Sequence, residues 1–230
     1  MVNHRASVLS LLLVASHAAA AALLGRRAVV LSAAPFLASQ MAPPAMAANP
    51  VREGMQAFSA GKVEESIALF DSVIEEKPAA KPYLWQRGLS LYYADRFADG
   101  AEQFKTDVAV NPNDTEESIW YFMCVARLKS FDAARKDLLK VGYDRRPYMR
   151  AAQQLFTGET DEAPLQAFAS STAANDAFYG NLYLGLFREA KGDADGAKAY
   201  LRAAVGTPYA RGSGDYMADL ARVHVKRRGW

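Results

Sequence analysis

Residues 85–114 read WQRGLSLYYADRFADGAEQFKTDVAVNPND. The short polar connection Asp95-Arg96 divides this stretch into two segments, and Pro112 stands at the end of the second, where it cannot continue a helix. Connections this short are suited to helices that run antiparallel to each other. The stretch therefore predicts a helical hairpin, with helices near 81–93 and 97–110.

The same pattern recurs at a period of 34 residues. One shift by this period places Gly54 on Gly88 and Phe70 on Phe104. The same shift places Val63 on Phe97, Ser66 on Gly100 and Pro78 on Pro112. A second shift places Phe97 on Phe131, Gly100 on Ala134 and Phe104 on Leu138. The third unit ends at Pro147, one residue late. A fixed period of this length indicates an array of repeated structural units.

The types of the recurring residues suit paired helices. A glycine in mid-helix, as at Gly88, costs about 1 kcal/mol relative to alanine, so we expect it to allow close packing against the second helix of its own hairpin. Gly100 and Ala134 are small where two helices would cross. We expect the hairpin cores to be filled by Phe70, Phe104 and Leu138.

Five hairpins and one further helix account for the rest of the chain. The expected helices are 50–60 with 63–77, 81–93 with 97–110, 115–128 with 131–141, 147–156 with 160–170, and 176–191 with 194–205. In the last hairpin Gly185 and Leu201 take the places of Gly54 and Phe70. A helix near 215–227 presents Met217, Leu220 and Ala221 and would cap the open end of the stack. The predicted fold is all-α, an α-solenoid of about five helical hairpins with a C-terminal capping helix.

Over residues 50–226 the chain resembles the tetratricopeptide repeat superfamily. Within it, the blocks RGLSLYY (87–93), NPND (111–114) and FYGNLYLG (178–185), together with Trp120, resemble the NlpI type of bacterial lipoprotein adaptors. That resemblance implies a non-enzymatic adaptor that docks a C-terminal-processing protease and brings substrates to it, or scaffolds cell-wall enzymes. The chain departs from the NlpI type in having no lipobox cysteine after its signal, so the resemblance does not extend to a lipid anchor.

The first 47 residues have the composition of a targeting presequence. No acidic residue precedes Glu53, and Ala45-Met46-Ala47 fits an A-x-A cleavage site. Two apolar runs, 6–24 and 28–38, flank the pair Arg26-Arg27, and this order resembles the bipartite presequence of thylakoid-lumen proteins. Secretion or export to the periplasm, and a retained anchor at 6–24, are the alternatives. We predict a presequence at 1–47 and a repeat domain at 48–230.

The concave face of such a stack is the predicted binding site. The resemblance to tetratricopeptide repeats places on it Met55, Phe58, Trp85, Leu89, Tyr92, Tyr93, Met123 and Arg127. Large aromatic residues, Met and Arg are enriched at binding hot spots, so we expect a protein or peptide partner there. The alternative is that several of these residues are core between adjacent hairpins, above all Leu89 and Ile119.

Other functions find little support in the sequence. Cleavage after Ala47 would change the net charge from +2 to −1, which does not suit nucleic acid. Cys124 is the only cysteine and is expected to be buried, and His224 and the paired acids are expected to lie in solvent at helix ends. The basic stretch 143–150 is expected to be a solvated linker. We predict no enzyme activity, cofactor, metal or small-molecule substrate.

A second class of function also fits the sequence. The chain could be a structural or assembly subunit that uses its convex face and termini, and a homodimer is also open. Any association with a membrane would depend on an uncleaved N-terminal segment.

Overall fold

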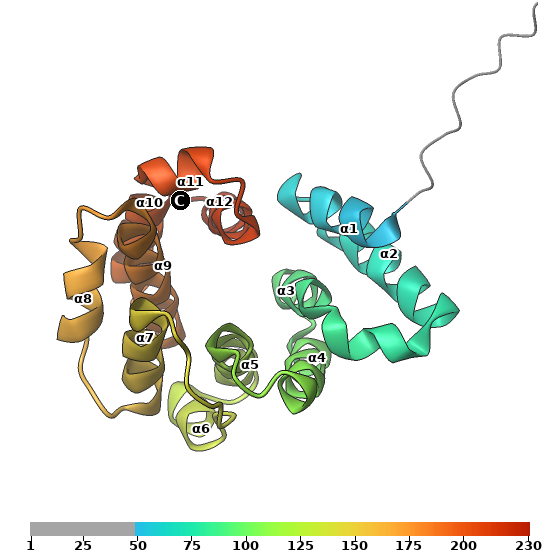
Figure 1. Ribbon diagram of the computed structural model, residues 1–230, viewed down its shortest axis with the longest axis horizontal. Coiled ribbons are helices and arrows are strands. Elements are labelled where there is room, and N and C mark those ends of the chain that lie inside the picture. The colour runs from blue at the N-terminus through green and yellow to red at the C-terminus, as the bar shows by residue number, and fades with distance from the viewer. Residues whose placement is uncertain (1–48) are drawn as a thin grey trace, which may run out of the picture. The chain divides into compact units, whose positions relative to one another are not determined.

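The computed structural model describes residues 49–230, which fold into helices with no strand among them (Figure 1). The all-α prediction is confirmed for this range. No helix in the described range has both the length and the apolar character that a bilayer span requires. The presequence predicted at 1–47 lies outside the described residues.

The helices follow the predicted order closely. Their bounds are α1 (Pro50–Ser59), α2 (Val63–Glu76), the 3₁₀ helix η1 (Pro78–Tyr83), α3 (Trp85–Tyr93), α4 (Phe97–Val110), α5 (Thr115–Leu128), α6 (Phe131–Lys136), α7 (Pro147–Thr157), α8 (Ala163–Ala169), α9 (Ala174–Ala190), α10 (Ala194–Gly206), α11 (Pro208–Gly212) and α12 (Tyr216–Arg228). Helix α11 was not predicted. Helix α3 begins four residues later than expected, because residues 78–83 form the 3₁₀ helix η1 and Leu84 then leaves helical backbone, with φ −106° and ψ 52°.

Helix α6 is shorter than the predicted 131–141. The chain after Lys136 leaves the helix and is held by bonds to other segments: the Ser118 hydroxyl donates to the Leu139 carbonyl (2.7 Å), and the Gly142 amide donates to the Pro112 carbonyl (2.7 Å). Leu138 consequently lies beyond the helix and is only partly buried, so it does not take the place of Phe104 in this hairpin.

The glycines of the repeat pattern lie against the core residues of their own hairpins. A Cβ on Gly88 would stand 2.6 Å from Cζ of Phe104, a residue with no exposed surface. The same relation holds between Gly54 and Phe70, and between Gly185 and Leu201. In these three hairpins the absence of one side chain lets a large side chain of the second helix fill the core.

Gly88→Ala should therefore destabilise the protein. The added methyl overpacks against Phe104 at a cost of about 1–3 kcal/mol. The contact of 2.6 Å places this cost above the low end of the range, so it outweighs the gain of about 1 kcal/mol in helix propensity. Urea unfolding followed by circular dichroism measures the change. Gly206→Ala is the matched control, because nothing lies within 4 Å of a Cβ at that helical position. Equal stability of the two variants would contradict the packing role of Gly88.

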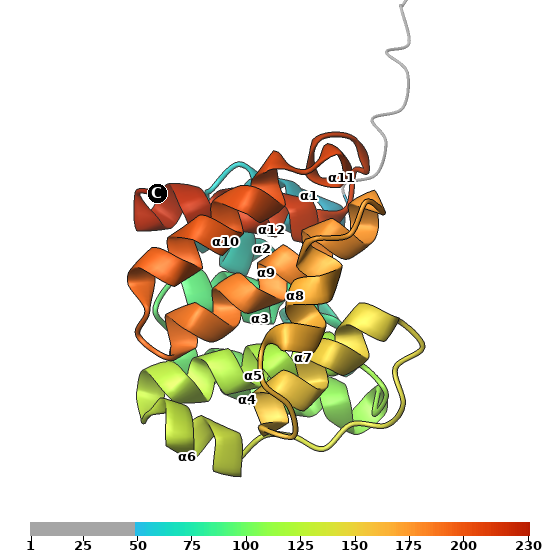
Figure 2. The same ribbon diagram turned by 90° about the vertical axis from the view of Figure 1, so that its left-hand side faces the viewer.

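The last helix returns to the first. Helix α12 packs against α10 and also against α1, so that the two ends of residues 49–230 meet (Figures 1 and 2). Its predicted capping residues Met217, Leu220 and Ala221 are buried. The rings of Phe58 in α1 and Tyr216 in α12 have centroids 5.5 Å apart. Side chains of α12 thus cover part of the inner side of the helices that precede it.

Candidate functional site

Most of the residues predicted to face an open groove are buried. Five of the eight are no more than 3% exposed: Phe58, Leu89, Tyr92, Tyr93 and Met123. Their expected exposure on a concave face is wrong, because α12 and neighbouring helices cover the helices that carry them. The alternative interpretation, that such residues are core, is right for Leu89 and also for Ile119.

The other three predicted residues keep some exposed surface. Trp85 and Met55 are partly exposed near α12, where the Trp85 ring lies edge-on to Tyr216 with centroids 5.6 Å apart. Arg127 lies elsewhere, near the end of α5, stacked over the Phe97 ring at 4.6 Å. Of the predicted set, the structure therefore brings only Met55 and Trp85 to a partly exposed position beside α12. We call this region, where α1 and α3 face α12, the seam.

His224 is not a solvated residue, in contrast to the prediction. It is fully buried, with Nδ1 2.8 Å from the Tyr93 hydroxyl and Nε2 3.2 Å from Oε2 of Glu189. Burial alone would raise the pKa of Glu189, but His224 and Arg228 lower it to about 2. No local pattern in the sequence indicates this arrangement, because Glu189 lies on α9 and meets the histidine only through the packing of α12.

Cys124 is a buried free thiol, as predicted. Burial raises its pKa above the ordinary value. Its sulfur would lie 3.0 Å from a Cβ at Gly100, so the small residue at 100 leaves room for the thiol where α4 meets α5. A thiol in this state lacks the thiolate character that reactive cysteines need.

A small cavity lies next to the seam. It has a volume of about 90 Å³ and we call it the inner pocket. Its lining residues are Trp85, Leu89, Phe104, Asp114, Glu116, Glu117, Trp120 and Met217. The acids come from the N-terminal end of α5, where Asp114 caps the helix and its carboxylate accepts from the Glu116 amide at 2.9 Å. Side chains of α3, α4 and α12 complete the wall.

Glu117 is the unusual member of this pocket. It is 6% exposed, and its Oε2 is buried without a hydrogen-bond partner. Burial, followed by the nearby charges of Asp114, Asp107 and Glu116, raises the pKa of Glu117 to about 8. The prediction that solvent explains this acid pair is wrong for Glu117, because α4 packs beside the first turn of α5 and removes the water.

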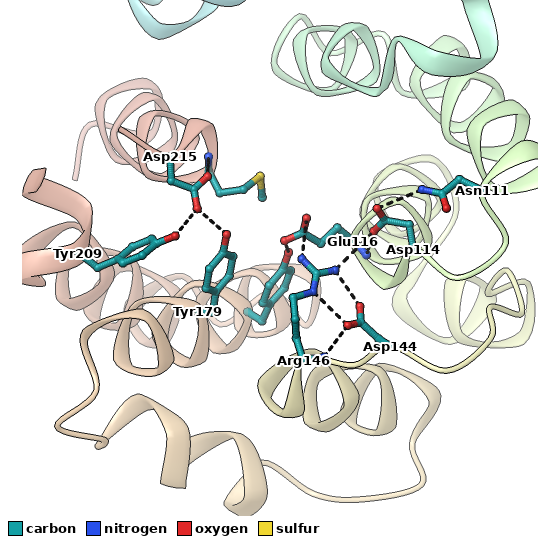
Figure 3. Close-up of polar contacts among 10 residues, drawn as sticks. Asn111, Asp114, Glu116, Asp144, Arg146, Tyr179, Tyr209 and Asp215 are labelled. Carbon is teal, nitrogen blue, oxygen red and sulfur yellow. Dashed lines mark hydrogen bonds and ion pairs between the residues drawn. The ribbon is translucent and has the colours of Figure 1, made fainter. Parts of the chain in front are cut away.

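A polar cluster centred on Arg146 adjoins the pocket (Figure 3). The guanidinium of Arg146 lies 2.7 Å from a carboxylate oxygen of Asp144, 3.4 Å from one of Glu116 and 3.8 Å from one of Asp114. The Tyr183 hydroxyl also donates to Glu116 at 2.8 Å. Burial nevertheless raises the pKa of Glu116 to about 7, with Arg146 opposing the rise.

Asp215 binds the neighbouring helices together. Its Oδ2 accepts from the hydroxyls of Tyr179 and Tyr209, both at 2.6 Å, and its Oδ1 accepts from the Met217 amide at 2.9 Å (Figure 3). These bonds fix the first turn of α12 against α9 and α11. Met217, which lines the inner pocket, is positioned by them.

Sequence reasoning missed the role of Arg146, which it placed in a solvated linker. The linker instead folds back so that Asp144, which is buried, accepts from the Arg146 amide at 2.9 Å and from its side chain. An aspartate two residues before a basic residue and just ahead of a helix-starting proline is a turn signal that could have indicated this. No neighbouring residue in the sequence indicates the ion pairs of Arg146 with Asp114 and Glu116 at the start of α5.

Within residues 49–230, no group of three or more His, Cys, Asp or Glu side chains is placed to hold a metal ion. No protein-family model matches this chain. The arrangement itself offers a small cavity with aromatic and acidic walls, next to two partly exposed apolar side chains. Its chemistry suits the binding of a group that carries positive charge.

Proposed function

We propose that the chain is a non-enzymatic adaptor of the tetratricopeptide type, which binds a protein partner at the seam. The observation that carries the proposal is the placement of partly exposed Trp85 and Met55 beside the inner pocket with its unpaired Glu117. A buried acid without a partner costs stability, so its presence in this pocket calls for an explanation. A partner group that completes the site supplies one.

The repeated glycine contact supports the solenoid class. Gly54, Gly88 and Gly185 each lie against a core residue of the second helix in the same hairpin, as the tetratricopeptide resemblance implies. A stack of such hairpins presents extended inner surfaces to partners. We infer that α12, which packs against α1 and contacts Trp85 of α3, covers part of such a surface here, and this restricts the proposed site to the seam.

The seam also has room for a partner's apolar side chains. A cleft of about 310 Å³ lies between α1 and α12 and is lined by Arg52, Met55, Gln56, Ser59, Gly214, Tyr216 and Asp219. One of its lining residues, Tyr216, has its ring 5.6 Å from that of Trp85 between centroids. Methionine and aromatic side chains that are partly exposed next to a cleft are the residues on which interface energy concentrates.

Purification of the native protein with whatever binds it, followed by titration of the identified partner, tests the proposal. Trp85→Ala and Met55→Ala should each weaken the partner at least about fivefold, equivalent to about 1 kcal/mol. Circular dichroism should show that both variants are folded. Unchanged partner affinity in both variants, or no partner at all, would contradict binding at the seam.

The alternative function is a structural subunit held through its outer surface. Tyr83 and Tyr143 favour it, since they are large and are 67% and 71% exposed. Tyr83→Ala and Tyr143→Ala are thus the matched variants for the experiment above. If these two variants lose partner binding while Trp85→Ala keeps it, the chain is a structural subunit held through its outer surface.

The compartment and the partner's identity belong to the same proposal. We propose the thylakoid lumen, with secretion or periplasmic export as the alternative, and a C-terminal-processing protease or a photosystem assembly component as the partner there. N-terminal sequencing of the native protein should find Ala48 as the first residue. A start at Met1 or Val2 would mean that the segment at 1–47 is retained.

A further inference from the structure

The inner pocket has two properties that together restrict its ligand. Its volume of about 90 Å³ is that of about three water molecules, which excludes a large guest. Its wall combines the rings of Trp85, Phe104 and Trp120 with the carboxyl groups of two glutamates and an aspartate. Aromatic faces attract cations through the ring quadrupole, and they do so more strongly away from water.

The carboxyl groups of this region exceed the positive charge available to them. Within the described residues, Arg146 is the only basic side chain that pairs with Asp114 or Glu116, and Asp144 also shares it. Glu117 forms no ion pair and leaves Oε2 unbonded, although it is more than nine-tenths buried. Asp107, one turn before the end of α4, also leaves a buried oxygen unbonded. When Glu117 is ionised, no basic side chain of the described residues pairs with it, so the site then lacks one positive charge.

We propose that the inner pocket binds an alkylammonium group, presented as the side chain of a lysine on the partner segment. This inference rests on the proposed adaptor function and specifies the chemistry of its partner. An ammonium is a compact charge with three donors at the end of a four-carbon stem, so it reaches a small pocket while its backbone stays at the seam. The unbonded oxygen of Glu117 accepts from it, and the rings surround the methylenes.

Other ligands fit less well. An anion would meet the carboxyl groups of Asp114, Glu116 and Glu117 without a free cation to receive it. An apolar guest would leave Glu117 unbonded and still more completely dehydrated. A divalent metal would need several ligands, and no group of three His, Cys, Asp or Glu side chains in residues 49–230 is placed to hold one.

The test uses n-butylammonium chloride as a probe with the intact purified protein at pH 8.5. The assigned indole N–H resonances of Trp85 and Trp120 report on the pocket. We expect saturable shifts with millimolar affinity for butylammonium, and at least tenfold weaker binding of 1-butanol, which has the same stem without the charge. Guanidinium chloride should also bind at least tenfold more weakly than butylammonium.

Variants separate the pocket from the rest of the surface. Glu117→Gln keeps the shape and removes the charge, and should weaken butylammonium at least tenfold. Glu117→Asp keeps the charge and should retain part of the affinity, while Glu64→Gln on the exposed face of α2 should leave it unchanged. Equal binding of butanol and butylammonium, absence of saturable shifts, or full affinity in Glu117→Gln would overturn the proposal.

The outcomes for the pocket and for the adaptor can be told apart. If a partner is lost with Trp85→Ala but butylammonium does not bind, the adaptor function stands and the ammonium pocket is refuted. If butylammonium binds through Glu117 but no protein partner is found, the pocket stands as a cation site and the adaptor function fails.

Discussion

Replacing Arg146 with methionine is expected to lower the free energy of unfolding by about 3 kcal/mol. Methionine keeps much of the apolar stem but removes the charge that Asp144, Glu116 and Asp114 share. Loss of one partner of a buried ion pair costs about 3–5 kcal/mol, because the remaining charge is left uncompensated. We place the effect at the lower end since the Arg146 side chain is 35% exposed. Urea unfolding monitored by circular dichroism gives the value.

Arg145→Met is the matched control for this experiment. Arg145 is exposed, stands next to Arg146 in the same turn and makes no side-chain ion pair in the described structure, so its replacement should change stability by less than about 0.5 kcal/mol. Arg146→Lys should recover only part of the loss, because a single ammonium cannot reproduce the forked contact with Asp144. Equal effects of Arg145→Met and Arg146→Met would show that the cluster contributes nothing beyond a surface charge.

The sequence predicted helix positions well because their signals are local. Short polar turns, prolines after helices, and a glycine opposite a large core residue each act over a few residues or within one hairpin. The contact of Gly88 with Phe104 is of this kind, since the two residues are only half a repeat apart. One exception is the late start of α3, which follows the 3₁₀ helix at 78–83 and the break at Leu84. The other is the early end of α6, where the Ser118 hydroxyl of α5 donates to the Leu139 carbonyl.

The candidate site could not be predicted in the same way, because it depends on contacts between distant parts of the chain. The predicted groove residues were chosen on the assumption that the inner face of the stack stays open. Tyr93 instead meets His224, 131 residues later, and Phe58 meets Tyr216. Nothing in the repeat pattern fixes where the capping helix finally packs, and that position decides which inner residues are buried.

The burial of the acids at the start of α5 could not be predicted either, because it also depends on tertiary contacts. Asp114, Glu116 and Glu117 have the spacing of a capped and acidic first turn, and Asp114 does cap the helix. A first turn of this kind is normally solvated. Its burial here requires Arg146 from one side and α4 from another, and the pairing of these elements is a property of the tertiary structure alone.

Stability should fall as the pH rises from 5.5 to 8.5. Burial raises the pKa of Asp107 and of Glu116 to about 7 and that of Glu117 to about 8, all above their usual values near 4. Between those limits the folded protein holds protons that the unfolded chain has released, so unfolding is increasingly favoured as pH rises. The stabilisation that these three groups provide is complete below their usual pKa values. It is lost as the pH rises through their raised pKa values. Glu189 has a lowered pKa, so its contribution to stability is lost only as the pH falls below 5.5.

We expect the three carboxyl groups together to cost several kcal/mol over this range, since each pH unit between their usual and raised pKa values corresponds to about 1.4 kcal/mol. For a domain of this size, each kcal/mol lost lowers the Tm by about 2–4 °C. Glu117→Gln should flatten the pH dependence and unfold at a higher temperature than the wild type at pH 8.5, whereas Glu64→Gln should follow the wild type. Added butylammonium should restore part of the wild-type loss at pH 8.5, because a bound cation favours the ionised Glu117 in the folded state alone. A flat profile in the wild type would mean that water or another charge reaches these carboxyl groups, and the buried acids would then provide no basis for a cation site.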